Sequence, residues 1–259
     1  MSNQLEPAIK ENLFEYLLRL GDDMLVLGQR LSEWCGHGPI LEEDIAMTNI
    51  ALDHVGQAEM ILRLAGEVEG KGRSENDLAY FRDETEYRNA LLLEQPRGHF
   101  GDTMARQFLF DAFAWLLYEE LKSSSYQPLA DIAAKAHKEI TYHLRHSRQW
   151  VLRLGAGTEE SHGRINQSFQ DLWPLTGELF FSNHVDQALV EAGMAPALEP
   201  LRLKWRELVT STLAEATLPV PNDPPFWAEG ARVGQHSEHL GHMLATMQIL
   251  PRSHPDAEW

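Results

Sequence analysis

The sequence of 259 residues is poor in cysteine and in positive charge. Its one cysteine, Cys35, excludes an intrachain disulfide framework. It has 22 Lys and Arg against 39 Asp and Glu, a formal net charge of −17. Because binding to phosphates needs clustered positive charge, this balance argues against a nucleic-acid partner.

Long hydrophobic runs and familiar catalytic motifs are also missing. No stretch approaches about 18 uncharged apolar residues, and the first residues lack the charged and then apolar design of a signal peptide. We therefore expect no contact with a membrane and a cytoplasmic location. The sequence has no G-x-S-x-G motif and no P-loop, so neither a serine nucleophile nor a nucleotide phosphate site is indicated.

What the sequence does contain is a helical pattern of apolar residues. The clearest helix runs from about Glu11 to Trp34, where apolar side chains recur three and four residues apart. Asp102 is expected to cap a later helix. With 43% apolar residues the chain is globular, and the fold class is all-α. The other expected helices are 41–65, a helix that begins near 102 and reaches at least 118, 129–154, 164–181, 199–218 and 236–250.

The lengths of the links between helices favour one architecture. Four long helices joined by a short link, a long crossover and another short link are typical of a ferritin-like four-helix bundle. We expect one domain over residues 1–259, with the core bundle at about 11–154 and additional C-terminal helices at about 164–250. An up-down-up-down bundle or an irregular helical array has the same periodicity and is the alternative.

Polar side chains interrupt these apolar stripes at one height of the bundle. Counting outward from helix turns near residues 38 and 126 places them level with one another. A buried charge is costly without a partner, so a metal centre or a network of ion pairs and hydrogen bonds would explain them. The candidates are Asp22, Asp23, His54, Gln57, Asp111, Glu139 and His143.

These candidates depart from the ferritin-like di-iron pattern. That pattern takes a Glu from each of two helices and a Glu-x-x-His from each of the other two. Here the corresponding positions read His54-x-x-Gln57 and Glu139-x-x-Tyr142, with His143 one residue late. We therefore expect no functional di-iron site and no metal, and a degenerate site filled by a polar network. A single adventitious metal ion is the alternative.

Three other features have competing interpretations. His236 and His239 could contribute to a zinc site, but the expected interpretation is a helix start packed on the bundle or on a partner. The helix that begins near 102 is apolar on several sides, which calls for either a partner or the later helices as cover. Arginines 145, 148 and 153 on one helix could bind an anionic ligand, although solvated arginines are ordinary there.

Several stretches, spread from residue 19 to residue 259, resemble sequences of one known family and occur in the same order as in that family. They are RLGDDMLVLGQRLSEWCGHGP, ALDHVGQA, DTMARQF, KEITYHLRHSRQW, ATLPVP and HSEHLGHMLATMQ, together with Trp259. These stretches resemble the PaaC family, the structural and non-catalytic subunits of bacterial 1,2-phenylacetyl-CoA epoxidase.

The resemblance implies a ferritin-like fold and a place in an oxygenase complex. The implied partners are PaaA, the catalytic subunit with the di-iron centre, PaaB, which bridges PaaA–PaaC units, and the reductase PaaE, which carries FAD and an Fe–S cluster. The complex would insert one oxygen atom of O₂ into the ring of phenylacetyl-CoA, with electrons from NADPH. This chain would carry no cofactor and no catalytic residue.

Other assignments are open at this point. A homodimer is one of them. The chain could also be a self-sufficient di-metal oxidase or oxygenase that uses Asp23, His54, Asp111, Glu139 and His143, or a regulatory module that binds an acyl-CoA.

Overall fold

The computed structural model describes residues 5–257, which contain helices and no strand. Trp259 lies outside the described residues. The all-α, ferritin-like bundle expected from the apolar periodicity is confirmed. The helices are α1 (Pro7–Ser32), α2 (Leu41–Glu69), α3 (Glu75–Tyr80), α4 (Leu91–Glu94), α5 (Phe100–Leu121), α6 (Gln127–Gly155), α7 (Glu159–Leu172), α8 (His184–Glu191), α9 (Leu198–Glu215) and α10 (Glu238–Ser253), with 3₁₀ turns η1 (Glu84–Glu86), η2 (Trp173–Phe180) and η3 (Ala231–Val233).

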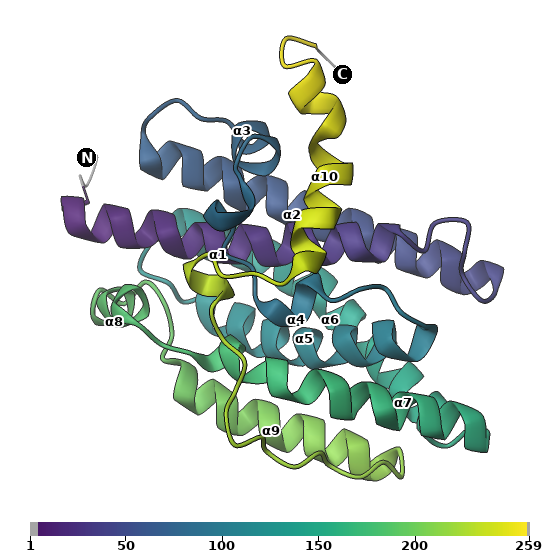
Figure 1. The fold of residues 1–259 in the computed structure, drawn as a ribbon. Coiled ribbons are helices and arrows are strands. Elements are labelled where there is room, and N and C mark those ends of the chain that lie inside the picture. Colours follow the sequence, from purple (N-terminus) through teal and green to yellow (C-terminus); the bar gives the residue numbers. More distant parts are fainter. Residues whose placement is uncertain (1–4, 258–259) are drawn as a thin grey trace.

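The bundle consists of two helix pairs joined by a long crossover. Helix α1 packs along α2, α5 packs along α6, and α2 meets α6 between the pairs (Figure 1). The crossover from α2 to α5 carries α3, η1 and α4. Helix α10 contacts α3 and η1 of this crossover and projects away from the bundle. Within residues 5–257, no helix has both the length and the apolar character that a membrane span needs.

Helix α5 lies at the centre of the molecule, and the later helices cover it. Helices α6, α7 and α9 all pack against it. Phe108 meets Phe169 of α7 edge to face, and the Trp205 indole of α9 donates to the Leu109 carbonyl at 2.9 Å. The apolar faces of α5 are therefore covered within the chain, which decides between the two alternatives left by its sequence.

Four details of the local structure differ from what the sequence predicted. His99, not Asp102, is the N-cap of α5; the Asp102 carboxylate instead accepts from the His99 N–H at 2.9 Å, as the third residue of a capping box. The helix expected over 164–181 ends at Leu172. Pro174 has no N–H to donate to an α-helical hydrogen bond, and the chain continues as the 3₁₀ turn η2. Helix α8 was not expected at all, and His236 lies before α10 rather than in it.

Two glycines of α2 give opposite predictions for the same substitution. Gly56→Ala should raise the free energy of unfolding by about 0.5–1 kcal/mol, because its methyl group would meet nothing within 4 Å. Gly66→Ala should lower it by about 1–3 kcal/mol, because its methyl group would collide with the Arg73 carbonyl oxygen. Urea unfolding measures both, and equal effects would contradict the close approach at Gly66.

Candidate functional site

Three buried side chains from three helices of the bundle meet at its mid-height. His54 comes from α2, Asp111 from α5 and His143 from α6, and none of the three is accessible to solvent. Their candidate ligand atoms, one per residue, lie within 4.8 Å of one another. We call these three residues the mid-bundle cluster. Each lies on the buried stripe of its helix, which is why the stripe's periodicity located it.

Neighbouring polar side chains hold the cluster in place. The Gln107 Nε2 atom donates to Asp111 Oδ1 at 2.7 Å and lies 3.2 Å from His54 Nε2. The Ser147 hydroxyl donates to Asp111 Oδ2 at 2.7 Å. On the far side of the His143 ring, Nε2 lies 3.0 Å from Asp53 Oδ2. The cluster is thus one part of a network that spans α2, α5 and α6.

Helix α1 contributes a thioether to this site instead of a carboxylate. The His54 Nδ1 atom lies 3.3 Å from the sulfur of Met24. Asp22 points elsewhere, pairing with Arg82 and accepting from the Arg88 N–H at 2.8 Å. The level expected for α1 was therefore nearly right, but the direction was not. Successive helical residues point about 100° apart, so equal height does not bring side chains together.

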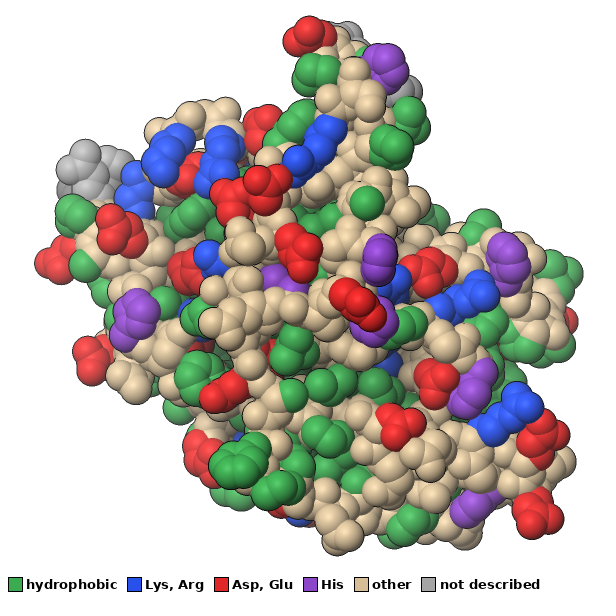
Figure 2. Space-filling view, in the orientation of Figure 1, with side chains coloured by type: hydrophobic (Ala, Val, Ile, Leu, Met, Phe, Trp, Pro, Cys, Tyr) green, Lys and Arg blue, Asp and Glu red, His purple; other side chains and the backbone are tan. Residues whose placement is uncertain are grey.

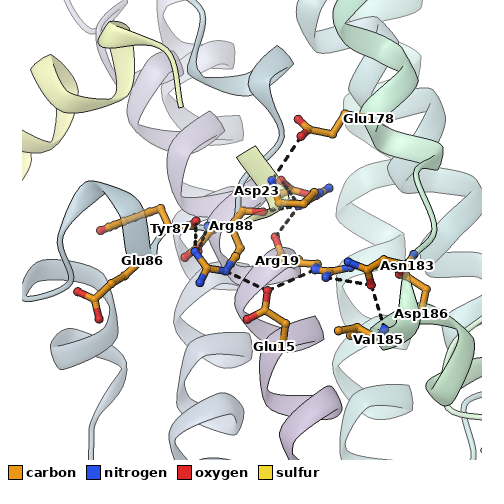
Figure 3. A network of polar contacts seen from close by, with 12 residues as sticks. Glu15, Arg19, Asp23, Glu86, Tyr87, Arg88, Glu178, Asn183, Val185 and Asp186 are labelled. Carbon is orange, nitrogen blue, oxygen red and sulfur yellow. Dashed lines mark hydrogen bonds and ion pairs between the residues drawn. The ribbon is translucent and has the colours of Figure 1, made fainter. Parts of the chain in front are cut away.

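Asp23 is committed to a different buried ion pair, with Arg232 from η3. The closest contact between the two side chains is 2.8 Å, and Asp23 Oδ1 also accepts from the Ala90 N–H at 2.8 Å. Around it lie the Arg19–Asp186 pair and the Glu178 carboxylate (Figure 3). These contacts fasten α1 to the crossover and to the C-terminal segments. Sequence reasoning missed Arg82, Arg232 and Glu178.

Gln57 and Glu139 form a third, separate contact between α2 and α6. The Gln57 amide donates to Glu139 Oε2 at 2.8 Å, and Glu139 is only partly buried. The seven candidates are thus divided among four places: Asp22 and Asp23 in two separate ion pairs, Gln57 with Glu139, and the other three in the mid-bundle cluster.

The donor set does not fit a di-iron centre. The mid-bundle cluster offers one carboxylate and two imidazoles, whereas the ferritin-like centre takes a carboxylate from each of four helices. The α1 position at this height is Met24, and both acids beside it are held by arginines.

Burial controls the charges of the cluster. Desolvation raises the pKa of Asp111 to about 6, although His143 and the hydrogen bonds from Ser147 and Gln107 oppose the rise. Desolvation, assisted by His143, lowers the pKa of His54 well below its ordinary value. His54 is therefore a neutral imidazole at pH 7, which is the form that accepts hydrogen bonds and binds metals.

The raised pKa of Asp111 predicts an unusual pH dependence of stability. In the metal-free chain the folded state holds this proton more tightly than the unfolded state, so Asp111 destabilises the fold as pH rises from about 4 to 6. The free energy of unfolding of Asp111→Asn, measured relative to that of the wild type, should therefore increase by about 2–3 kcal/mol from pH 4 to pH 7. Urea unfolding at both pH values measures the difference, with the exposed Asp171→Asn as the control. A constant difference would contradict the burial effect.

The histidine-rich segment before α10 packs on the rest of the chain, as expected from the sequence. His236 Nδ1 lies 2.8 Å from Glu94 Oε2, its Nε2 lies 3.0 Å from the Tyr87 carbonyl oxygen, and the side chains of His236 and Glu94 are fully buried. The carbonyl of His239 accepts from Arg30 at 2.9 Å. The ring of His236 is thus occupied by protein partners.

Two of the α6 arginines are engaged by the chain itself. Arg148 pairs with Glu215 of α9, and Arg153 lies over the ring of Trp150. Figure 2 shows that basic side chains on one face of the molecule lie among acidic ones. The anionic-ligand surface considered for α6 gains no support from these contacts.

Comparison with known proteins assigns the chain to a family. The model of the family described as phenylacetic acid catabolic protein, PaaA_PaaC, matches residues 1–259. The C subunit of 1,2-phenylacetyl-CoA epoxidase from Escherichia coli (strain K12) is 48% identical to it over 247 residues, which cover 95% of this chain and 99% of the relative.

Proposed function

Because the chain belongs to the family of phenylacetic acid catabolic proteins, we propose that it is the structural subunit of a 1,2-phenylacetyl-CoA epoxidase. Its partner is PaaA, the catalytic subunit, which provides the di-iron centre. PaaB joins such pairs, and the reductase PaaE passes electrons from NADPH through FAD and an Fe–S cluster. The assembled enzyme epoxidises the ring of phenylacetyl-CoA with one oxygen atom of O₂.

The observation that carries the non-catalytic role is the composition of the mid-bundle cluster. One carboxylate is too few for a pair of irons, and the nearby acids Asp22 and Asp23 neutralise buried arginines instead. A chain that keeps the bundle but lacks the carboxylates of a di-iron centre can stabilise and position a catalytic partner. It contributes no redox cofactor to the reaction.

Exposed apolar side chains support a role in assembly. Leu41, Ile45 and Leu52 recur four and seven residues apart along α2, and each is more than half exposed. Apolar side chains grouped on one helix face are typical of surfaces that other proteins cover.

The test is reconstitution of the complex with and without this chain. PaaA, PaaB and PaaE are combined with phenylacetyl-CoA, NADPH and O₂, and epoxide formation and iron content are measured. We expect the chain alone to form no epoxide and to contain negligible iron. The complete mixture should form epoxide and contain iron. About two irons per chain in the isolated protein, with turnover, would instead identify a self-sufficient oxidase. Binding of phenylacetyl-CoA to the isolated chain would favour the regulatory module.

One conservative substitution distinguishes the structural role of this chain from the role of a self-sufficient di-metal oxidase. Glu139→Gln preserves an oxygen that can accept from Gln57 and removes a carboxylate that a di-metal oxidase would need. We expect turnover of the reconstituted complex to change by less than about twofold, as for the exposed control Glu160→Gln. A loss of a hundredfold or more in the Glu139 variant alone would overturn the structural role.

A further inference from the structure

The mid-bundle cluster contains polar atoms that the protein leaves without partners. Within the described residues, His143 Nδ1 and Gln107 Oε1 are buried and accept or donate no hydrogen bond. A buried polar atom without a partner keeps its full desolvation cost, so native proteins rarely leave one unpaired. These two unpaired atoms lie beside three side chains that can bind a metal, which makes the cluster a candidate binding site.

The histidine rings present their free nitrogens as metal ligands. The carboxylate of Asp53 lies 3.0 Å from His143 Nε2, so the proton belongs on Nε2 and the lone pair on Nδ1. A carboxylate that holds the outer nitrogen of a histidine in this way is the usual support for a metal-binding imidazole. At His54, Nδ1 faces the Met24 sulfur, which leaves Nε2 for the cluster.

Gln107 occupies the position of a cation. Its amide nitrogen lies between two acceptors, 2.7 Å from Asp111 Oδ1 and 3.2 Å from His54 Nε2. A metal ion in this position would satisfy both acceptors more strongly than a neutral amide can. The ion would displace the Gln107 amide from this position. Rotation of the side chain away from it, with the carboxamide turned over, would direct Oε1 toward the ion and give that unpaired oxygen a partner.

We propose that His54, Asp111 and His143 bind one divalent transition metal ion, with Gln107 Oε1 as the fourth ligand. The ion that fits these ligands best is Zn²⁺. Two imidazoles, a carboxylate and a further oxygen make a donor set that zinc accepts in tetrahedral geometry. Bonds of about 2.0–2.2 Å require the ligand atoms, now within 4.8 Å of one another, to close in by side-chain rotation. The ion ties α2, α5 and α6 together at the centre of the bundle.

This site is distinct from a di-iron centre and independent of the proposed function. A single ion on these residues has a structural effect and takes no part in oxygen chemistry, which belongs to the partner. The second carboxylate of the network, Asp53, lies behind His143 and supports the ring.

The experiment is a metal titration of the full-length chain. The protein is stripped with a chelator, and ZnCl₂ or CoCl₂ is added while bound metal is counted by mass spectrometry. We expect one ion per chain, the intense visible absorption of four-coordinate Co²⁺, and a higher melting temperature with Zn²⁺.

Three variants locate the ion. His54→Leu removes a ligand and should weaken binding by at least a hundredfold. Asp53→Asn changes a partly exposed supporting group, is not expected to disturb folding, and should weaken binding 10–100-fold. His146→Gln is the matched control on the same helix as His143, because His146 pairs with Glu43 outside the cluster, and it should bind like the wild type.

Two outcomes would overturn the proposal. One is a wild-type chain that takes up no stoichiometric Zn²⁺ or Co²⁺; the other is binding that is equally tight in His54→Leu. Neither outcome affects the structural role of the chain in the complex. That role fails instead if the isolated chain holds two irons and turns over substrate.

Discussion

Asp23→Ala is expected to lower the free energy of unfolding by about 3–5 kcal/mol. Asp23 and Arg232 are both buried and form two hydrogen bonds of 2.9 and 2.8 Å with each other. Removing the carboxylate leaves the guanidinium charged in the interior and also removes the acceptor of the Ala90 N–H. The loss exceeds the value of one contact, because the remaining charge keeps its full desolvation cost. Urea unfolding at pH 7 measures it.

Two further variants test this explanation. Glu59→Ala breaks an ion pair with Arg63 in which both side chains are about half exposed, and it should cost less than about 1 kcal/mol. The double variant Asp23→Ala with Arg232→Met should recover part of the loss, because no unpaired charge remains. A double variant less stable than Asp23→Ala would show that Arg232 stabilises the fold through other contacts.

The sequence predicted the long helices well and the short elements poorly. The periodicity that locates a helix accumulates over its length, so α1, α2, α5 and α6 were predicted within a few residues. Helix α8 has only eight residues, too few for a clear stripe. The capping of α5 was misassigned because a histidine ring, which is not among the favoured N-cap side chains, accepts the hydrogen bond there.

For the site, the sequence predicted heights more reliably than directions. His54, Asp111 and His143 come together because each also lies on an apolar stripe, which specifies the direction of the side chain as well as its level. Asp22 and Asp23 had only a level, and their partners Arg82 and Arg232 lie 60 and 209 residues away. No local pattern connects residues at such separations.

Two other members of the network left a signal that was not used. Gln107 lies four residues before Asp111, and Ser147 lies four residues after His143. Residues four apart share a helix face, so both side chains were candidates for contact with the cluster. Asp53 gave no such signal, because it precedes His54 and meets a ring from another helix.

Glu178→Gln is expected to cost about 2–4 kcal/mol, although the substitution is nearly isosteric. The buried carboxylate of Glu178 accepts from the N–H groups of Gly230, Ala231 and Arg232 with Oε1, and from the Leu91 N–H at 2.8 Å with Oε2. A glutamine replaces one of these acceptors with an NH₂ group, so donors would face donors on one side. The charge that strengthens the remaining hydrogen bonds is also lost.

The place at which backbone amides lose protection from hydrogen exchange distinguishes this explanation from a general loss of stability. Glu178 joins η2 to the crossover and to η3, the turn that carries Arg232. In Glu178→Gln, the amides at Leu91 or at 230–232 should therefore exchange with solvent faster than the rest of the core. The control Glu229→Gln changes an exposed side chain of the adjoining segment and should leave both stability and exchange unaltered. Unchanged exchange at these amides in the Glu178 variant would show that they are protected by packing rather than by the carboxylate.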